Sequence, residues 1–418
     1  MKIAFILKSF PALSETFILN QITGLLDRGL EVDIYAYRPR NDPAVHADVE
    51  RYNLLKHVCY MTLSASMPRN KIYRVLKGLG HVATGLYKNP MVILNSLNFL
   101  KFGKDAVSLS LFYQTIPFLG KGPYDIIHCQ FGDLGHLAIT LKAVGAIRGE
   151  IVTTFRGYDI SSYISERSEH IYDALFKKGN LFLCVSNQIK GTLINLGCEE
   201  RRIIVHRSGV HINKFCVRLR HSKTAGKLRL LTVARLVEKK GVQYGIQAVA
   251  KVLKKYPNIE YKIVGDGRLK KTLHGLIADL KVCDNVKLLG WQRQEEVVEL
   301  LREADILLAP SVTSQSGDSE GIPGAIVEAL ACGLPVLSTR HSGIPEVIQD
   351  GESGLLVPER DTDALAAKLE YLIEHSELWP EMGRKGRAYV EEHYDIDKLN
   401  DRLVEIYQRL LAGELPNS

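Results

Sequence analysis

The stretch DILLAPSVTSQSGDSEGIPGAIVEALACGLPVLST, residues 305–339, contains two short apolar runs on either side of a helical pattern. The runs at 305–310 and 335–339 are typical of strands that are buried on both faces of a sheet. Pro323 favours the first turn of a helix, so we expect a helix to begin close to Ile322. A strand, a helix and a second strand in this order predict one unit of a parallel sheet.

The same alternation extends in both directions and weakens only near 207–227, where the sequence becomes polar and basic. At 418 residues the chain exceeds what one hydrophobic core usually covers. We therefore expect an α/β protein with two Rossmann-like, doubly wound parallel-sheet domains that face each other across a cleft. Further strands are expected at 2–7, 31–37, 124–129, 151–155, 181–186, 202–206, 228–233, 259–264, 285–290 and 354–358.

This pattern also gives the expected domain boundaries. The N-terminal domain should span 1–207, a linker 208–226 and the C-terminal domain 227–393. The last segment, 394–418, is expected to form a helix that packs back on the N-terminal domain.

Composition limits the class of protein. Apolar residues make up 46% of the chain and charged residues 24%, which is typical of globular proteins. Seven cysteines without a CxxC pair argue against a disulfide framework or a zinc site and favour a reducing compartment, so we expect a cytoplasmic protein. Without a run of 18 apolar residues, a membrane-spanning helix is not expected.

Positive charge is concentrated in the segment 62–120, where Asp105 is the only acidic residue. Such a segment suits peripheral contact with an anionic membrane surface. A solvated basic helix pair explains the charge equally well. No nucleic-acid motif or pattern of stacking aromatic residues accompanies it, so nucleic acid is not an expected partner.

Polar residues follow several strands of the second half. Arg235 and Lys240 precede an expected helix start, where together they could bind a diphosphate, or they are simply solvated loop charges. Gly265 and Gly267 allow either a tight turn or the close approach of a ligand. Trp291 could border a nucleobase or pack at a domain edge.

Two glutamates bracket the Gly-Ile-Pro-Gly turn of the opening stretch. Glu320 is expected in the loop and Glu328 inside the helix, where small residues share its face: Gly324, Ala325, Ala331 and Cys332. A face without bulky side chains suits a rigid ligand. Two carboxylates, with the N–H groups of Gly321 and Ile322 between them, suit a polyol that also carries phosphate.

These residues resemble a known family. Glu320 and Glu328, with seven residues between them, match the EX7E motif of retaining glycosyltransferases with the GT-B fold, in the large group called family 4. The stretches ARLVEKKG, VGDGRL, ADILLAPS and GIPEVIQDGESGLLVP also resemble the donor-binding domain of that family. The N-terminal half resembles a narrower group, which builds bacterial exopolysaccharide, lipopolysaccharide or colanic acid on lipid carriers, through SFPALSETFILNQI, IIHCQFG and TFRGYDIS.

The resemblance implies transfer of a hexose, with retention, from a nucleotide-diphosphate sugar bound by the C-terminal domain to a polyprenyl-linked or saccharide acceptor on the N-terminal domain. It implies that Glu320 contacts sugar hydroxyls near the reacting carbon and Glu328 the ribose hydroxyls. Arg235, Lys240 and the N–H of Gly321 would then stabilise the leaving diphosphate. Neither a cofactor nor a metal is expected.

On the acceptor side, the resemblance implies that Ser14 and Glu15 face the cleft, although Ser14 would also serve simply as a helix N-cap. Many members of the wider family have a histidine at the position of Arg156, before the Gly-Tyr-Asp sequence that ends at Asp159. His128 follows a neighbouring strand, where it could occupy nearby space or only bond to the strand ends.

Two other functions are compatible with two such domains: a nucleotide-sugar 2-epimerase and a non-catalytic module that binds a sugar nucleotide or a lipid. A dinucleotide oxidoreductase is disfavoured because neither first strand leads into GxGxxG. The two Asp-x-Asp pairs, at 361–363 and 395–397, both open expected helices, and N-capping explains them without a metal.

Overall fold

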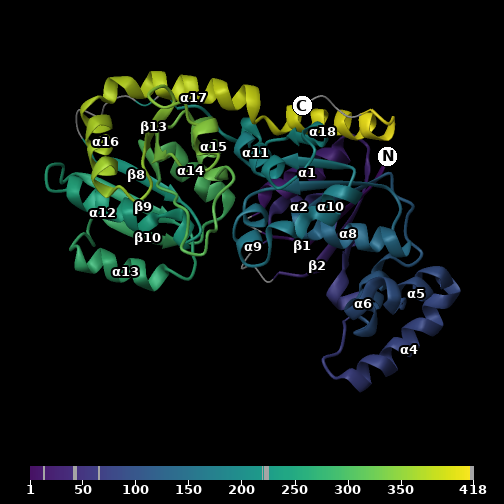
Figure 1. Ribbon diagram of the computed structural model, residues 1–418. Helices are drawn as coiled ribbons and strands as arrows, with labels where there is room; N and C mark the ends of the chain where they lie inside the picture. Colours follow the sequence, from purple (N-terminus) through teal and green to yellow (C-terminus); the bar gives the residue numbers. More distant parts are fainter. Residues whose placement is uncertain (13–14, 41–44, 65, 219, 221–225, 415–418) are drawn as a thin grey trace.

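The computed structural model describes residues 1–12, 15–40, 45–64, 66–218, 220 and 226–414, and two parallel sheets form its framework (Figure 1). The first sheet has the order β3-β2-β1-β4-β5-β6-β7 and the second β10-β9-β8-β11-β12-β13. The strands of the first sheet are β1 (Lys2–Ser9), β2 (Glu31–Arg38), β3 (Val58–Tyr60), β4 (Ile126–Gln130), β5 (Glu150–Phe155), β6 (Leu181–Cys184) and β7 (Ile203–Val205). Those of the second are β8 (Leu228–Val233), β9 (Ile259–Val264), β10 (Val286–Gly290), β11 (Ile306–Ala309), β12 (Val336–Thr339) and β13 (Gly354–Val357). The expected α/β architecture of two doubly wound parallel sheets is confirmed.

Strand order reverses once in each sheet, between β1 and β4 in the first and between β8 and β11 in the second. Loops on either side of such a reversal diverge and leave a crevice at the carboxyl ends of the strands. The loops after β1 and β8 carry the Glu15 and Arg235 regions. The topology therefore places both regions where ligands of such sheets bind.

Helices cover both faces of each sheet, which is why the strands read as continuous apolar runs. In β1, for example, Ile3, Phe5 and Leu7 belong to one buried layer and Ala4 and Ile6 to the opposite one. The helices of the first half are α1 (Thr16–Asp27), α2 (Ala47–Arg51), α3 (Met61–Ser64), α8 (Gly132–Val144), α9 (Ser162–Ser165), α10 (Asp173–Lys178) and α11 (Asn187–Asn195). Those of the second are α12 (Val242–Val252), α13 (Lys270–Asp279), α14 (Gln294–Glu303), α15 (Gly324–Ala331), α16 (Thr362–Glu374) and α17 (Trp379–His393).

Helix α15 begins two residues later than the sequence predicts. Pro323 is its N-cap, with an extended ψ of 122°, and the first helical residue is Gly324 rather than Ile322. The turn before α15 is bonded to the loop after β12 instead of joining the helix: the carbonyl of Gly321 accepts a hydrogen bond of 3.2 Å from the N–H of Gly343. Asp361 and Asp395 cap α16 and the last helix as expected.

The last helix, α18 (Ile396–Leu411), returns to the first sheet and lies beside α1 (Figure 1). Its residues Leu403, Ile406 and Tyr407 are buried in the same layer as Phe5 of β1. The chain crosses between the two halves twice, and the crossings are hydrogen-bonded to each other. Val210 donates to the carbonyl of Tyr394 and accepts from the N–H of Ile396.

Between β3 and β4 the chain forms a group of helices at the edge of the first half. They are α4 (Lys71–Lys88), α5 (Pro90–Ser96), α6 (Phe99–Val107) and α7 (Ser110–Thr115). Figure 1 shows α4, α5 and α6 at this edge, and residues of α5 and α7 pack on the core of the first sheet. Within the part of the chain that the structure describes, none of the helices combines the length and the apolar character needed to span a bilayer.

Candidate active site

The centre of the candidate site is an ion cluster at the carboxyl ends of β8 and β11. The loop after β8 forms a short 3-10 helix, Glu238–Lys240, which places two adjacent lysines beside Glu320. The Nζ of Lys240 lies 2.9 Å from Oε2 of Glu320, and the Nζ of Lys239 lies 3.5 Å from Oε1. Lys239 also binds Asp318 at 3.0 Å. Two cations and two carboxylates thus share one small, largely buried volume.

This cluster keeps Glu320 ionised. Burial alone raises the pKa of its carboxyl group, but Lys240, Lys239 and Arg235 outweigh burial and lower the pKa to about 2. Burial lowers the pKa of Lys240, and Glu320 opposes that shift. Oε1 of Glu320 is buried and accepts no hydrogen bond from the described residues.

A buried histidine fixes the backbone at Glu320. The N–H of Glu320 donates to Nε2 of His341 at 3.1 Å, so Nδ1 of His341 carries the proton and donates to Glu359 at 2.6 Å. Glu359 also accepts from the N–H of Thr313. This chain of bonds positions the glutamate that faces the lysines.

Glu328 lies on α15, partly exposed, in quite different surroundings. Burial raises the pKa of its carboxyl group to about 7. Its neighbours on the helix include the buried Ala331 and Cys332, as the sequence pattern indicates. The two glutamates of the EX7E spacing therefore have carboxyl groups whose pKa values are shifted in opposite directions.

The two glycines after β9, Gly265 and Gly267, allow two loops of the protein to pack closely against each other, rather than a ligand against a loop. A Cβ on Gly265 would lie 1.9 Å from the carbonyl oxygen of Ala234, and one on Gly267 would lie 2.6 Å from that of Leu236. Gly265 also has a φ of +132°, which L side chains rarely adopt. These glycines pack the loop after β9 on the loop that carries Arg235 and Lys240.

Arg235 is exposed, and Trp291 is partly exposed directly after β10. Burial raises the pKa of Glu15, and the charge of Arg235 is among those that oppose this rise; Arg235 also helps the lysines to lower the pKa of Glu320. The charge of Arg235 therefore acts on carboxyl groups of both halves of the chain.

In the first half, Arg156 occupies the position where a histidine is common in the resembled family. Its guanidinium is buried, donates to Oε1 of Gln130 at 2.6 and 3.1 Å, donates to Oγ of Ser208 at 2.6 Å, and stacks on Phe17 at 4.0 Å. Burial lowers the pKa of Arg156 to about 9, while the charges of Asp159 and Glu15 oppose the shift. It is a buried cation held by neutral acceptors.

Asp159 and His128 are fully buried behind Arg156. The carboxylate of Asp159 accepts from the N–H groups of Arg156, Gly157 and Gly132, each at 3.0 Å, so it fixes the loop that carries Arg156. His128 lies within β4 and bonds to Tyr407 at 2.6 Å and to Thr154 at 2.7 Å. Burial holds the pKa of His128 well below its usual value, so its ring is neutral.

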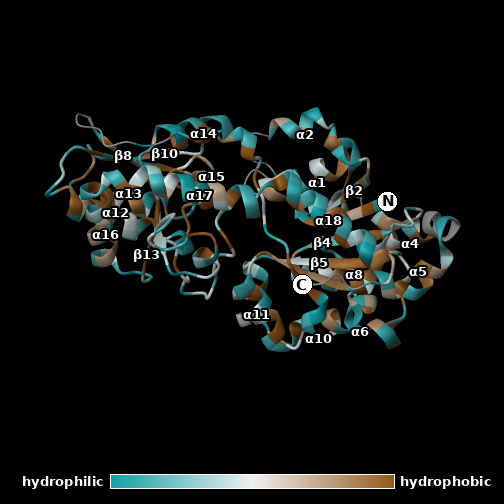
Figure 2. Cartoon of the chain, turned by 90° about the horizontal axis from the view of Figure 1, so that it is seen from above, coloured by the Kyte–Doolittle hydropathy of each residue, from teal (hydrophilic) through white to brown (hydrophobic). Residues whose placement is uncertain are grey.

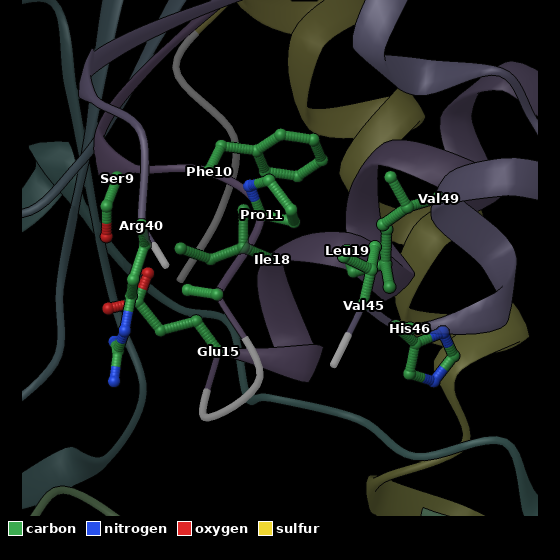
Figure 3. A pocket seen from close by; sticks show the side chains of 11 residues that line it. Ser9, Phe10, Pro11, Glu15, Ile18, Leu19, Arg40, Val45, His46 and Val49 are labelled. Atoms are coloured by element: carbon green, nitrogen blue, oxygen red, sulfur yellow. The ribbon is translucent and has the colours of Figure 1, made fainter. Parts of the chain in front are cut away.

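A pocket lies next to this corner, at the end of β1 (Figure 3). Glu15 and Arg40 lie together on one side of it, and His46 and Val49 lie on the other. Burial raises the pKa of Glu15, and Arg40, Arg156, Arg235 and Lys8 oppose that shift. Glu15 is the N-cap of α1 without a side-chain capping bond, and Ser14 lies outside the described residues.

The loops of the two halves touch at this site. A Cβ on Gly321 would lie 2.2 Å from the carbonyl oxygen of Arg156, so only glycine fits there. Behind the contact, the carboxylate of Glu346 accepts from the N–H of Asn187 at 2.8 Å and from that of Gln188 at 2.9 Å. The candidate site is thus assembled from both halves.

Comparison with known proteins identifies the family. Residues 14–214 match the model described as Glycosyltransferase Family 4, and residues 218–389 match Glycosyl transferases group 1. The chain is 35% identical over 418 residues to the putative colanic acid biosynthesis glycosyltransferase WcaL of Salmonella typhimurium, with 98% of this chain and 100% of WcaL covered.

The chain belongs to glycosyltransferase family 4. It is also 39% identical to the amylovoran biosynthesis glycosyltransferase AmsK of Erwinia amylovora, with 98% of this chain and all of AmsK covered. The family match identifies the chain as a glycosyltransferase, as the EX7E resemblance implies. It gives no support to the alternative hypotheses of an epimerase or a non-catalytic binding module.

Solved structures show the same GT-B fold. Anabaena Alr3699/HepE, crystallised with UDP and glucose, has a TM-score of 0.69 and 19% identity, and 98% of this chain and 99% of HepE are covered. Sucrose-phosphate synthase from Thermosynechococcus elongatus has a TM-score of 0.71 and 18% identity, and 99% of this chain and all of the synthase are covered.

The structure adds site residues that the sequence did not single out: Lys239, His341 and Glu359. Lys239 is one of two adjacent lysines, and the sequence gives no reason to prefer either. His341 follows β12, and the carboxyl-end rule for parallel strands, applied to that loop, would have drawn attention to it. Glu359 follows β13 in the same way.

Proposed function

We propose that this family 4 glycosyltransferase transfers a hexose, with retention of anomeric configuration, from a nucleotide-diphosphate sugar to a polyprenyl-linked or growing saccharide acceptor in bacterial surface polysaccharide synthesis. The observation that carries the proposal is Glu320, an ionised carboxylate paired with Lys239 and Lys240, whose Oε1 accepts no hydrogen bond from the described residues. The names of WcaL and AmsK support the pathway. The UDP-glucose complex of HepE, with a TM-score of 0.68, supports a nucleotide-sugar donor.

In this reaction the bond between C1 of the sugar and the phosphate oxygen breaks, and its electron pair leaves with the nucleoside diphosphate. The acceptor hydroxyl forms the new bond on the same face of the sugar. Its proton passes to the departing phosphate oxygen, so no side chain has to act as a base.

The protein supplies electrostatic stabilisation of both charges that develop. Lys240 and Arg235, with the N–H of Gly321, offset negative charge on the leaving diphosphate. The carboxylate of Glu320 accepts hydrogen bonds from sugar hydroxyls and favours positive charge on the ring. Glu328, on α15, binds the ribose hydroxyls.

The other residues support donor and acceptor. Gly265, Gly267, Ile322 and Trp291 shape the donor side. On the acceptor side Glu15 borders the pocket of Figure 3. Ser14, which lies outside the described residues, and Arg156 contact the acceptor in this proposal. Asp159 and His128 act by holding the loop and strand around Arg156, since both are buried and hydrogen-bonded.

We also propose that transfer requires neither a metal nor a cofactor, because Lys239, Lys240 and Arg235 supply the positive charge at the site. Transfer should therefore proceed undiminished in excess EDTA. Activity that is lost in EDTA and restored by Mn²⁺ or Mg²⁺ would show this proposal to be wrong.

The test of the function is a panel of UDP-, GDP- and ADP-sugars, offered with and without lipid extract as the source of acceptor. One donor should be consumed in an acceptor-dependent way, and NMR of the product should show the anomeric configuration of the donor. Inversion would exclude the retaining mechanism. Conversion of donor in the absence of acceptor would instead indicate epimerase chemistry.

A further inference from the structure

Helix α4 exposes its apolar face to solvent, unlike an ordinary surface helix. A surface helix normally directs its apolar stripe inward and its charges to water. In α4, Ile72, Leu76 and Leu79 follow the helical spacing i, i+4, i+7, yet they are 73%, 61% and 61% exposed. The apolar stripe of α4 therefore faces outward.

Its basic residues hold it in this orientation. The guanidinium of Arg74 donates to the carbonyl of Pro68 at 2.8 Å and to that of Ser108 at 3.0 Å. The ammonium of Lys77 donates to the carbonyl of Ser66 at 2.9 Å and to its hydroxyl at 2.8 Å. These bonds turn Arg74 and Lys77 toward the neighbouring segments, so the helix cannot bury its apolar stripe by rotating without breaking them.

Helix α5 packs beside α4 at the edge of the molecule (Figure 2), and both α5 and α6 carry further exposed hydrophobic side chains. Of the twenty large hydrophobic side chains that are exposed among the described residues, ten lie between positions 72 and 107. They are Ile72, Tyr73, Val75, Leu76, Leu79, Met91, Leu94, Phe99, Leu100 and Val107. Single exposed apolar residues are ordinary, but a concentration of this kind indicates an interaction surface.

Charge indicates what covers the surface. Between 62 and 120 one acidic residue, Asp105, accompanies seven basic ones: Arg69, Lys71, Arg74, Lys77, Lys88, Lys101 and Lys104. A second copy of the chain would place these positive surfaces against each other, which electrostatic repulsion disfavours. Exposed apolar side chains among exposed lysines instead match the acyl chains and anionic headgroups of a membrane.

We propose that the α4–α6 surface, residues 71–107, docks on the surface of an anionic lipid bilayer. The apolar side chains of α4, α5 and α6 enter the interface between headgroups and acyl chains, and the exposed lysines bind the headgroups. This docking is separate from the proposed glycosyl transfer, because it requires neither donor nor acceptor and is measured without them.

The test is co-sedimentation of the full chain with vesicles that contain phosphatidylglycerol and with vesicles of phosphatidylcholine alone. We expect binding to the anionic vesicles that weakens strongly as salt is raised. The triple variant Ile72→Ser, Leu76→Ser, Leu79→Ser should bind about tenfold more weakly or worse, because it loses the inserted apolar groups. Lys101→Ala with Lys104→Ala should also weaken binding, by about tenfold or more.

The matched control replaces exposed apolar residues elsewhere, Ile194→Ser, Val217→Ser and Leu280→Ser, and should bind like the unchanged chain. Thermal melting of each variant verifies folding, and serine at exposed positions should leave it intact. Full binding by the α4 triple variant, equal binding to both kinds of vesicle, or dimerisation that this variant abolishes would each overturn the proposal.

Discussion

Glu320 and Glu328 lie eight positions apart, but cations surround Glu320 and none shifts the pKa of Glu328. Lysines lower the pKa of Glu320 to about 2, whereas burial raises that of Glu328 to about 7. The sequence predicted the separate places of the two carboxylates from the turn and the small residues of one helix face. It could not predict that both lysines approach Glu320, because Lys240 comes from a loop 80 positions earlier.

At this scale, Lys240→Ala should lower turnover by on the order of 10²-fold or more, in the range of a lost oxyanion donor. The loss should appear in kcat with saturating donor. Lys251→Ala is the matched control. Lys251 is an exposed lysine in the last turn of α12, where it pairs with Asp363 of α16. Unchanged turnover in Lys240→Ala would remove this lysine from the site.

The raised pKa of Glu328 predicts a pH-dependent stability. The folded chain holds the Glu328 proton up to about pH 7 and the unfolded chain only to about 4.5, so this group's contribution is lost as pH rises through that window. Replacing the carboxyl in Glu328→Gln should therefore raise the free energy of unfolding by up to about 3 kcal/mol at about pH 8 and change it little at about pH 4.

Urea unfolding without donor, at both pH values, measures this difference. Glu405→Gln, an exposed glutamate on α18, provides the control and should show no such dependence. A stabilisation of equal size at both pH values would mean that the titration of Glu328 is not its cause.

At the scale of elements, prediction succeeded where burial alone decides the pattern. The runs 228–233 and 259–264 coincide with β8 and β9 because both faces of these strands are covered. The start of α15 was predicted two residues early, since Pro323 fits an N-cap as well as a first turn. The outward stripe of α4 could not be predicted, because it depends on carbonyl groups that Arg74 and Lys77 reach only in the folded chain.

The glycine after β9 offers a test at this scale. Gly265→Ala should lower the free energy of unfolding by about 2–4 kcal/mol, because its Cβ would overlap the carbonyl of Ala234 and its φ is positive. Gly275→Ala, in the following helix α13 with open space around it, should instead stabilise by about 0.5–1 kcal/mol. Chemical denaturation of both variants measures the contrast, and similar values would contradict it.

At the scale of the whole molecule, two sheets were predictable from the alternation of strands and helices, but the meeting of their loops was not. Arg156 and Gly321, or Asn187 and Glu346, lie more than 150 positions apart, and no local pattern joins them. At the position where many family members have a histidine, this chain has the buried Arg156, which donates hydrogen bonds to the neutral side chains of Gln130 and Ser208. The residue type alone does not predict these partners.

The return of α18 to the first sheet predicts a long-range effect on stability. Tyr407→Phe should cost about 1–3 kcal/mol, because it leaves Nδ1 of the buried His128 without its partner. Tyr371→Phe, at an exposed tyrosine on α16, should be close to neutral. Thermal unfolding of the two variants compares them, and equal stability would mean that the bond to His128 contributes nothing.

The same helix sets an order of events during synthesis. The strands of the first sheet are complete at Val205, but Leu403, Ile406 and Tyr407, which fill one of its apolar layers, leave the ribosome only after the strands of the second sheet. Domains generally fold as units, the N-terminal one first. Here one apolar layer of the first sheet remains incomplete until the whole second sheet has been translated. The first half therefore completes its folding only together with the second.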